Sequence, residues 1–182
     1  TYNFVNGRRE FGVIVACVVD GVTRHGWIYD VLSGDIACAE KDNGAYINGG
    51  PVRVSGTARI SEAQGYINKK YLPGYAKHLY ARCQDMTGGV YSLRCTAHEY
   101  MALARGDMEF AIYSKSKPWD HLAGALLFSE AGGIVSCWDG SPYAPHHVQT
   151  GLLAAASQEL DRELRAVMIE PLLEEQRRRQ TG

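Results

Sequence analysis

The amino-acid sequence predicts an α/β protein in which an antiparallel sheet comes first and a mixed arrangement of strands and helices follows. Residues 11–50 contain apolar runs separated by turn sequences such as Asp20-Gly21, which is typical of an antiparallel meander. From about Gly65 onward, short apolar strands alternate with segments of helical spacing, which is typical of an α/β arrangement. A helix over 118–131 is the most clearly bounded element.

Composition excludes several classes of function. The chain has 182 residues and a formal net charge of −1, which argues against the basic face that nucleic-acid binding requires. No apolar run approaches the roughly 18 residues that suggest a membrane span. The five cysteines are scattered and lack close pairs, so neither a disulfide framework nor structural zinc is expected. We therefore expect a cytoplasmic protein with neither a nucleic-acid partner nor a membrane partner.

The meander consists of a first strand over 11–19 and further strands over 22–29, 35–40 and 44–48. The first strand is continuously apolar and rich in β-branched residues, so it is predicted to be buried on both faces. An antiparallel sheet normally leaves one face to water. Helices covering both faces of this sheet would account for the pattern.

The second half of the chain supplies helices and further strands. Gly106 ends one predicted helix and Ser157 begins another as its N-cap. The predicted helices are 71–83, 95–105, 118–131 and 157–169, and the predicted strands are 90–92, 108–113, 134–138 and 151–155. We place the division between an N-terminal antiparallel-sheet domain, 1–84, and a C-terminal α/β domain, 85–182.

The helix over 118–131 contains the first candidate functional residue. Pro118 suits the first helical position, and Gly132-Gly133 supplies the left-handed conformation that ends a helix. Asp120 lies in the first turn of this helix. Its carboxylate has two interpretations: it stabilises the positive end of the helix dipole, or it is a metal ligand beside a phosphate.

Two segments resemble the signatures of one family. Residues 118–133 read Pro-Trp-Asp, then Ala-Gly, then Glu-Ala-Gly-Gly, and resemble the C-terminal signature of the inositol monophosphatase family. Residues 1–4, Thr-Tyr-Asn-Phe, match the last four positions of its N-terminal signature, Asp-Pro-x-Asp-Gly-Thr-x-Asn-Phe. The resemblance covers nearly the whole chain. It implies a layered α-β-α-β-α sandwich whose second sheet is smaller and mixed or parallel.

The resemblance implies a lithium-sensitive, Mg²⁺-dependent phosphomonoesterase that acts as a homodimer on a small polyol or alcohol phosphate. Asp120 would bind the metal and contact the substrate. The hydroxyl of Thr1 would orient the attacking water, and its backbone N–H would bind a phosphate oxygen. The family's other carboxylate ligands precede the position of Thr1, so we expect these 182 residues alone to have no measurable Mg²⁺-dependent phosphatase activity.

Substrate selection is expected to come from the second half of the chain. Cys95 and Thr96 align with a family segment that contacts the sugar, and Tyr113 stands where inositol enzymes have a glutamate. Because these residues depart from the inositol pattern, the phosphatase alternatives are histidinol phosphate, 3′-phosphoadenosine 5′-phosphate and fructose 1,6-bisphosphate. A non-catalytic binding module of the same fold is the other alternative. His121 is interpreted as a core or surface histidine, and Glu99 is assigned no chemistry.

Overall fold

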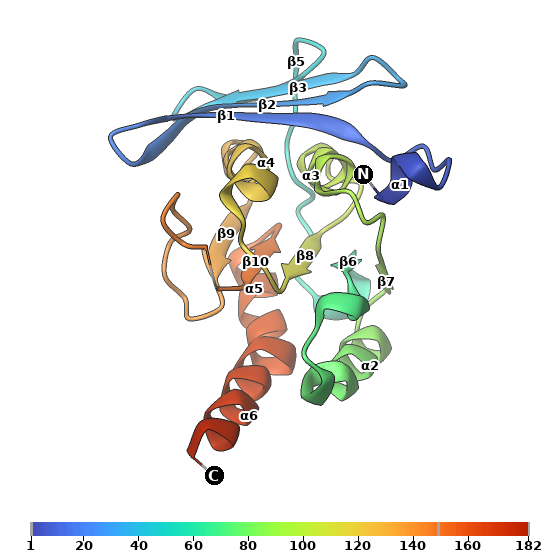
Figure 1. The fold of residues 1–182 in the computed structure, drawn as a ribbon, viewed down its shortest axis with the longest axis vertical. Helices are drawn as coiled ribbons and strands as arrows, with labels where there is room; N and C mark the ends of the chain where they lie inside the picture. Colours follow the sequence, from blue (N-terminus) through green and yellow to red (C-terminus); the bar gives the residue numbers. More distant parts are fainter. Residues whose placement is uncertain (1, 149, 182) are drawn as a thin grey trace.

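The structure, a computed structural model, describes residues 2–148 and 150–181. Two five-stranded sheets are separated by a pair of helices, and further helices cover the far side of the second sheet (Figure 1). The layers therefore follow the order sheet, helices, sheet, helices. This arrangement confirms the predicted sandwich of an antiparallel sheet followed by a mixed α/β part.

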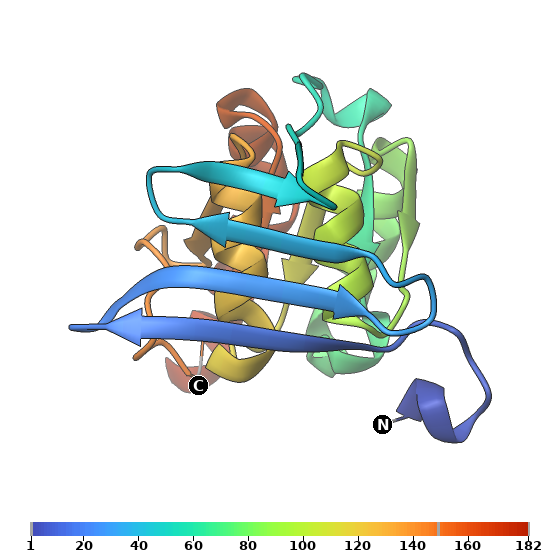
Figure 2. The same cartoon turned by 90° about the horizontal axis from the view of Figure 1, so that it is seen from above.

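The first sheet is the predicted meander, with the strand order β1-β2-β3-β4-β5 and antiparallel neighbours throughout. A register shift between Cys17 and Val18 interrupts the pairing of the first two strands. The short helix α1 (Tyr2–Val5) lies beside this sheet (Figure 2). The strands are β1 (Gly12–Val19), β2 (Val22–Asp30), β3 (Ile36–Glu40), β4 (Gly44–Ile47) and β5 (Gly50–Pro51).

The prediction that the first strand is buried on both faces is wrong. Val13 and Val15 of β1 are each 50% exposed, and Trp27 on the neighbouring strand is 38% exposed. Because side chains alternate along a strand, only the inner face of the sheet packs on helices. Among residues 2–148 and 150–181, no helix covers the outer face, which is open in Figures 1 and 2.

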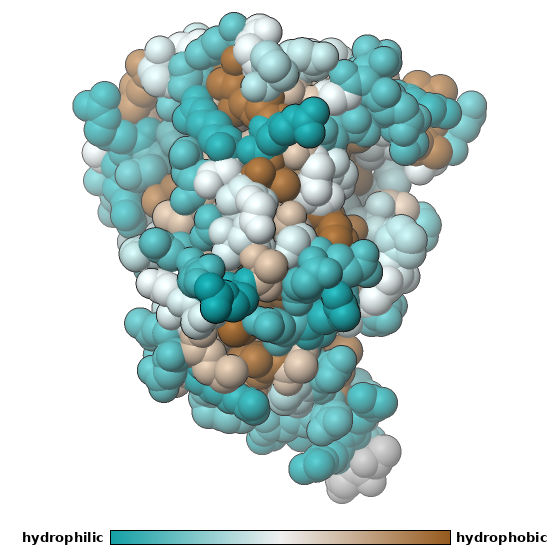
Figure 3. All heavy atoms as spheres, turned by 180° about the vertical axis from the view of Figure 1, so that it is seen from behind, coloured by the Kyte–Doolittle hydropathy of each residue, from teal (hydrophilic) through white to brown (hydrophobic). Residues whose placement is uncertain are grey.

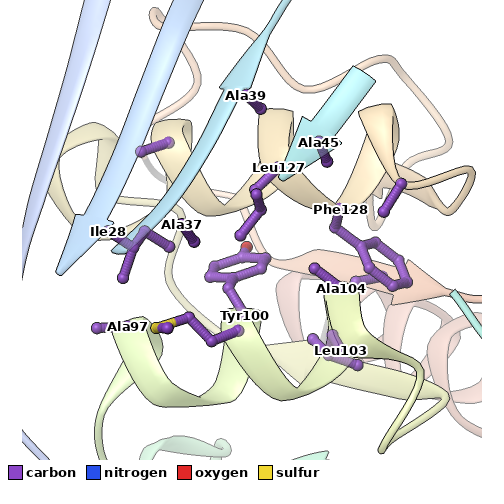
Figure 4. Close-up of a cluster of buried hydrophobic side chains, with 14 of the residues drawn as sticks. Ile28, Ala37, Ala39, Ala45, Ala97, Tyr100, Leu103, Ala104, Leu127 and Phe128 are labelled. Carbon is purple, nitrogen blue, oxygen red and sulfur yellow. The ribbon is translucent and has the colours of Figure 1, made fainter. Parts of the chain in front are cut away.

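The middle layer consists of α3 (Thr96–Arg105) and α4 (Pro118–Glu130), which pack under the first sheet (Figure 4). Both helices end as predicted, because Gly106 and Gly132 have left-handed φ angles of 78° and 98°. Gly26 of β2 allows α4 to approach closely, since a Cβ there would lie 2.9 Å from the backbone of Ala123. The main core therefore lies between the first sheet and these two helices.

The second sheet has the order β7-β6-β8-β10-β9 and is mixed. The strand β6 is parallel to both of its neighbours, whereas β10 is antiparallel to both of its own. The strands are β6 (Gln64–Ile67), β7 (Gly89–Tyr91), β8 (Phe110–Tyr113), β9 (Ile134–Cys137) and β10 (Leu152–Ala155).

Helices on the far side of the second sheet form a second core with it. Ser157 caps α5 as predicted, because its hydroxyl oxygen accepts a hydrogen bond of 3.2 Å from the N–H of Leu160. The helices are α2 (Lys77–Met86), α5 (Gln158–Leu164), the π-helical segment η4 (Arg165–Ile169) and α6 (Glu170–Thr181); short 3₁₀ helices are η1 (Ile60–Glu62), η2 (Lys69–Tyr71) and η3 (Gly74–Ala76).

The chain passes from one sheet to the other earlier than the expected division after residue 84. The strand β6 pairs within the second sheet, and Leu79 and Cys83 of α2 lie in the second core. The strand β6 is only four residues long, so its hydrophobic pattern is a weak sequence signal. The change of layer falls between β5 and β6.

Hydrophilic atoms predominate on the rear face of the molecule, where hydrophobic atoms form separate patches (Figure 3). In the part of the chain that the structure describes, no helix combines the length and apolar character needed to cross a membrane.

Candidate active site

A cleft lies where the first turns of α3 and α4 meet the end of β8 and the start of β1. Its volume is about 420 Å³, and α1 and η2 contribute further walls. The cleft contains four of the predicted site residues, which are Cys95, Thr96, Tyr113 and Asp120. Tertiary structure thus brings together residues from three separate elements, whereas Thr1 lies outside the described residues.

Asp120 occupies the first turn of α4, where the helix begins at Pro118. Burial raises the pKa of its carboxyl group, and the ammonium of Lys117 opposes that rise. Within residues 2–148 and 150–181, the carboxylate makes neither a hydrogen bond nor an ion pair within 4 Å. A partly buried carboxylate that makes no such contact with the described residues is available to a cation or a ligand.

The first turn of α3 places Cys95 and Thr96 on another wall of the cleft. Cys95 is the N-cap residue and makes no capping hydrogen bond through its side chain. Burial raises the pKa of the Cys95 thiol, so the group stays neutral and is a poor nucleophile. Thr96, the first helical residue, presents a hydroxyl group that can both donate and accept.

Tyr113, at the end of β8, packs against a buried histidine. Its ring centroid lies 4.6 Å from that of His121, which is 4% exposed. Nδ1 of His121 lies 3.1 Å from the hydroxyl oxygen of Tyr100, and burial lowers the pKa of His121 to about 4. His121 is therefore a neutral core residue that links α4 to α3, which is the first of the two predicted alternatives, core or surface.

Glu99 is a cleft residue that sequence reasoning missed. It lies in the first turn of α3, is 4% exposed, and accepts a hydrogen bond of 3.0 Å from the N–H of Leu93. Burial raises the pKa of Glu99 to about 7, while nearby backbone amides and Tyr113 oppose the rise. The sequence does contain a signal for this position, because Glu99 is a carboxylate on a face of α3 whose other buried residues are mostly apolar.

The raised pKa makes a prediction for stability. Below pH 4.5 Glu99 is neutral in both the folded and unfolded states, and as pH rises through 7 the folded chain must carry a buried charge. Relative to Glu99→Gln, the wild-type free energy of unfolding should therefore fall by about 3 kcal/mol between pH 4.5 and 8. Denaturant unfolding of both chains at several pH values measures this difference. A pH-independent difference would contradict the assignment.

Positively charged side chains form the rim of the cleft, and sequence reasoning missed the lysines among them. Three of them lie over aromatic rings: Arg94 over Tyr2, Lys115 over Tyr71 and Lys117 over Trp119, at 5.1, 5.4 and 5.6 Å from the ring centroids. Lys70 also lines the cleft. Cation–π contacts of this kind hold exposed charges in place. The rim can therefore attract an anionic ligand such as a phosphate group.

The described residues fit only part of a metal site. Mg²⁺ binds through one or two protein carboxylates, with water and phosphate oxygens completing its coordination. Asp120 offers one such oxygen donor. No group of three or more His, Cys, Asp or Glu side chains in the described part of the chain could hold a metal ion. A two-metal centre would therefore need ligands in addition to those of the described residues.

The fold and the cleft together define an α/β sandwich protein with a cleft lined by positively charged side chains. The chain belongs to the inositol monophosphatase family, whose family model matches residues 1–175. The family accounts for both the sandwich and the position of Asp120 at the tip of α4.

The chain is similar to relatives that are named for several different functions. A fructose-1,6-bisphosphatase/inositol-1-monophosphatase of Thermotoga maritima is 29% identical over 140 residues, which are 77% of this chain and 54% of the relative. The Nus factor SuhB of Escherichia coli is 30% identical over 181 residues, which cover 94% of this chain and 65% of SuhB. A histidinol-phosphatase of Chlorobaculum parvum is 30% identical over 140 residues, which cover 76% of this chain and 53% of that relative. The chain thus spans about half to two thirds of their length.

Solved structures share the fold. Inositol monophosphatase II of Staphylococcus aureus superposes with a TM-score of 0.85 at 21% identity, covering 93% of this chain and 64% of that one. The inositol monophosphatase of Anabaena superposes with a TM-score of 0.81 at 25% identity, covering 92% of this chain and 67% of that one. The layered architecture is therefore that of inositol monophosphatases.

Proposed function

We propose that the protein containing this chain is a Mg²⁺-dependent phosphomonoesterase that hydrolyses a small polyol or alcohol phosphate. One observation carries the proposal: the partly buried carboxylate of Asp120 makes no hydrogen bond or ion pair with the described residues, and it lies in a cleft lined by basic side chains. Family membership and the phosphatase names of several relatives support it.

The residues of the cleft suit different parts of the reaction, which are binding the phosphate group and holding the metal ion. Lys115, Lys117 and Arg94 attract the phosphate dianion, and the first turn of α3 offers the hydroxyl of Thr96 to it. Asp120 is the oxygen ligand that would hold Mg²⁺. When bound, the metal supplies charge neutralisation on the phosphoryl oxygens and lowers the pKa of a bound water. The role proposed for Thr1 lies outside the described residues.

The substrate is proposed as a small phosphorylated metabolite, and the protein as a cytoplasmic homodimer. Contacts with the non-phosphate part of the substrate are assigned to Thr96, Tyr113 and Cys95, all of which line the cleft. Histidinol phosphate, 3′-phosphoadenosine 5′-phosphate and fructose 1,6-bisphosphate are the alternative substrates. The relatives' names include two of these activities, in the histidinol-phosphatase and the fructose-1,6-bisphosphatase.

A non-catalytic binding module is the second candidate function. Among the described residues, Asp120 belongs to no group of three or more side chains that could hold a metal ion. Several relatives bear the name Nus factor rather than the name of a phosphatase. This candidate predicts that a small phosphate binds in the cleft without being hydrolysed.

A panel of small phosphates, assayed on the whole protein with Mg²⁺ and with EDTA, tests the two candidates. The phosphatase proposal expects Mg²⁺-dependent release of inorganic phosphate that is inhibited by lithium. The same assay on the 182-residue chain is expected to give no turnover. Absence of turnover by the whole protein on every phosphate, with ligand binding retained, would favour the binding module.

A further inference from the structure

We propose that the loop over 143–147 positions the phosphate-binding lysines of the cleft, with Tyr143 and Ser116 as the positioning residues. The inference rests on the proposed function for its ligand, a phosphate group. Lys115 and Lys117 both line the cleft, and Ser116 between them is fully buried. In the described part of the chain neither lysine makes an ion pair within 4 Å, so both charges are available to an anion.

Ser116 is held by this loop through both its side chain and its backbone. Its hydroxyl group donates a hydrogen bond of 2.8 Å to the carbonyl oxygen of His147. Its own carbonyl oxygen accepts a hydrogen bond of 2.8 Å from the hydroxyl group of Tyr143. The loop is itself tightly folded, because the N–H of Ala144 donates to Nδ1 of His147 at 3.0 Å. Ser116 therefore cannot turn or shift without breaking a hydrogen bond to the loop.

The segment before α4 has further anchors on either side of the buried serine. On one side, the hydroxyl group of Ser114 donates to the carbonyl oxygen of Tyr71 at 2.9 Å. The ring of His121 also interacts with the backbone of Lys115. On the other side, the carbonyl oxygen of Lys117 accepts the N–H of His121 at 3.1 Å. The loop thus completes the set of contacts that fixes the backbone from which both lysine side chains extend.

Fixing this backbone matters because a lysine side chain is long and flexible. Its ammonium group is a point charge on a four-carbon stem, and ordering such a side chain and its loop on binding lowers affinity. The hydrogen bonds of Ser116 order the segment before phosphate binds. The rings of Tyr71 and Trp119 restrain the ammonium groups, whose Nζ atoms lie 5.4 and 5.6 Å from the ring centroids. Loss of one of these hydrogen bonds should therefore weaken phosphate binding.

Binding of inorganic phosphate to the whole protein, measured by calorimetry, tests the inference without requiring turnover. Tyr143→Phe removes one hydroxyl group and keeps the ring, whose centroid lies 6.4 Å from that of His147. It should weaken phosphate binding about fivefold, the effect of losing one hydrogen bond, and Ser116→Ala should do the same. Tyr46→Phe is the matched control, because the hydroxyl group of Tyr46 also donates to a backbone carbonyl oxygen, that of Asn43, but does not line the cleft.

The effect should act through the lysines, which distinguishes positioning from a general loss of structure. In a Lys115→Met/Lys117→Met background, Tyr143→Phe should weaken phosphate binding no further, because the charges that it positions are absent. A fivefold loss that persists in that background would overturn the inference. Unchanged binding in both Tyr143→Phe and Ser116→Ala would overturn it as well.

Kinetics of the whole protein give a second readout. Tyr143→Phe should raise KM for p-nitrophenyl phosphate about fivefold and leave kcat within about twofold. A fall in kcat at unchanged KM would contradict a role in phosphate binding. If the protein binds phosphate but turns over no ester, the proposed function fails, and the binding measurement still decides the role of Tyr143. A wild-type protein that does not bind phosphate would overturn the inference.

Discussion

Replacing Asp120 with asparagine is expected to lower phosphate-ester turnover by the whole protein at least about a hundredfold. Asparagine keeps the shape of the side chain but removes the charge that would hold a divalent cation. The carboxylate has no hydrogen bond or ion pair with the described residues, so its loss breaks no contact within the fold. Steady-state kinetics across a range of Mg²⁺ concentrations measures the effect, and weaker metal dependence should accompany it.

The control for Asp120 is a carboxylate in the first turn of another helix. Glu159 occupies that position in α5, is paired with Arg162, and does not line the cleft. Glu159→Gln should leave turnover unchanged, and both variants should unfold within about 1 kcal/mol of wild type, the size of a helix-dipole contribution. A normal rate for Asp120→Asn would remove this residue from the site.

Replacing Gly124 with alanine is expected to destabilise the chain by about 3 kcal/mol, although alanine favours helices by about 1 kcal/mol over glycine. A Cβ at Gly124 would lie 2.0 Å from Cδ2 of Tyr100. The Tyr100 ring is fully buried between α3, α4 and the first sheet and is held by its contact with His121, so it cannot turn aside (Figure 4). The steric clash lowers stability and the helix propensity of alanine raises it, so the sign of the measured change shows which effect is larger.

Denaturant unfolding of the 182-residue chain measures the Gly124 effect. Gly56→Ala is a suitable control, because a Cβ there would meet nothing within 4 Å. Combining Gly124→Ala with Tyr100→Leu should recover part of the loss by making room for the new methyl group. Stabilisation by Gly124→Ala alone would show that α3 and α4 are not packed as closely as described.

The Gly124 contact also bears on the site. It brings α4, with Asp120 at its tip, against α3, with Thr96 and Glu99 in its first turn. Because both helices are held between the two sheets, their first turns face the same cleft. The Gly124–Tyr100 contact therefore helps to set the distance between the first turns of α3 and α4, which carry the residues proposed to bind substrate and metal.

Sequence reasoning predicted the elements whose signals are local. The meander was read from β-branched runs and turn residues, and α4 from Pro118 at its start and Gly132 at its end; each was confirmed. Such signals are strong because backbone conformation at prolines and glycines depends on the residue itself. The resemblance that placed Asp120 in a site was likewise carried by short contiguous motifs, and family membership is confirmed.

Burial and long-range neighbours were not predictable in the same way. The apolar strand β1 was expected to be covered on both faces, yet its outer face is open in the described chain. The strand β6 and helix α2 lie with the second sheet, and both fall within 1–84, the range predicted for the antiparallel-sheet domain. In both cases the sequence pattern specified an apolar face but not the element that packs against it.

The sequence by itself determined the strands of the meander and the two ends of α4, and that Asp120 would stand at a helix tip, because those outcomes follow from residues a few positions apart. Only the tertiary structure decided that Glu99 joins Asp120, Thr96 and Tyr113 in one cleft. The physical reason is that burial and the packing of α3 beside α4 set the ionisation state, the orientation and the neighbours of a carboxylate. Burial and helix packing depend on residues far apart in the sequence, so a single helical turn does not specify them.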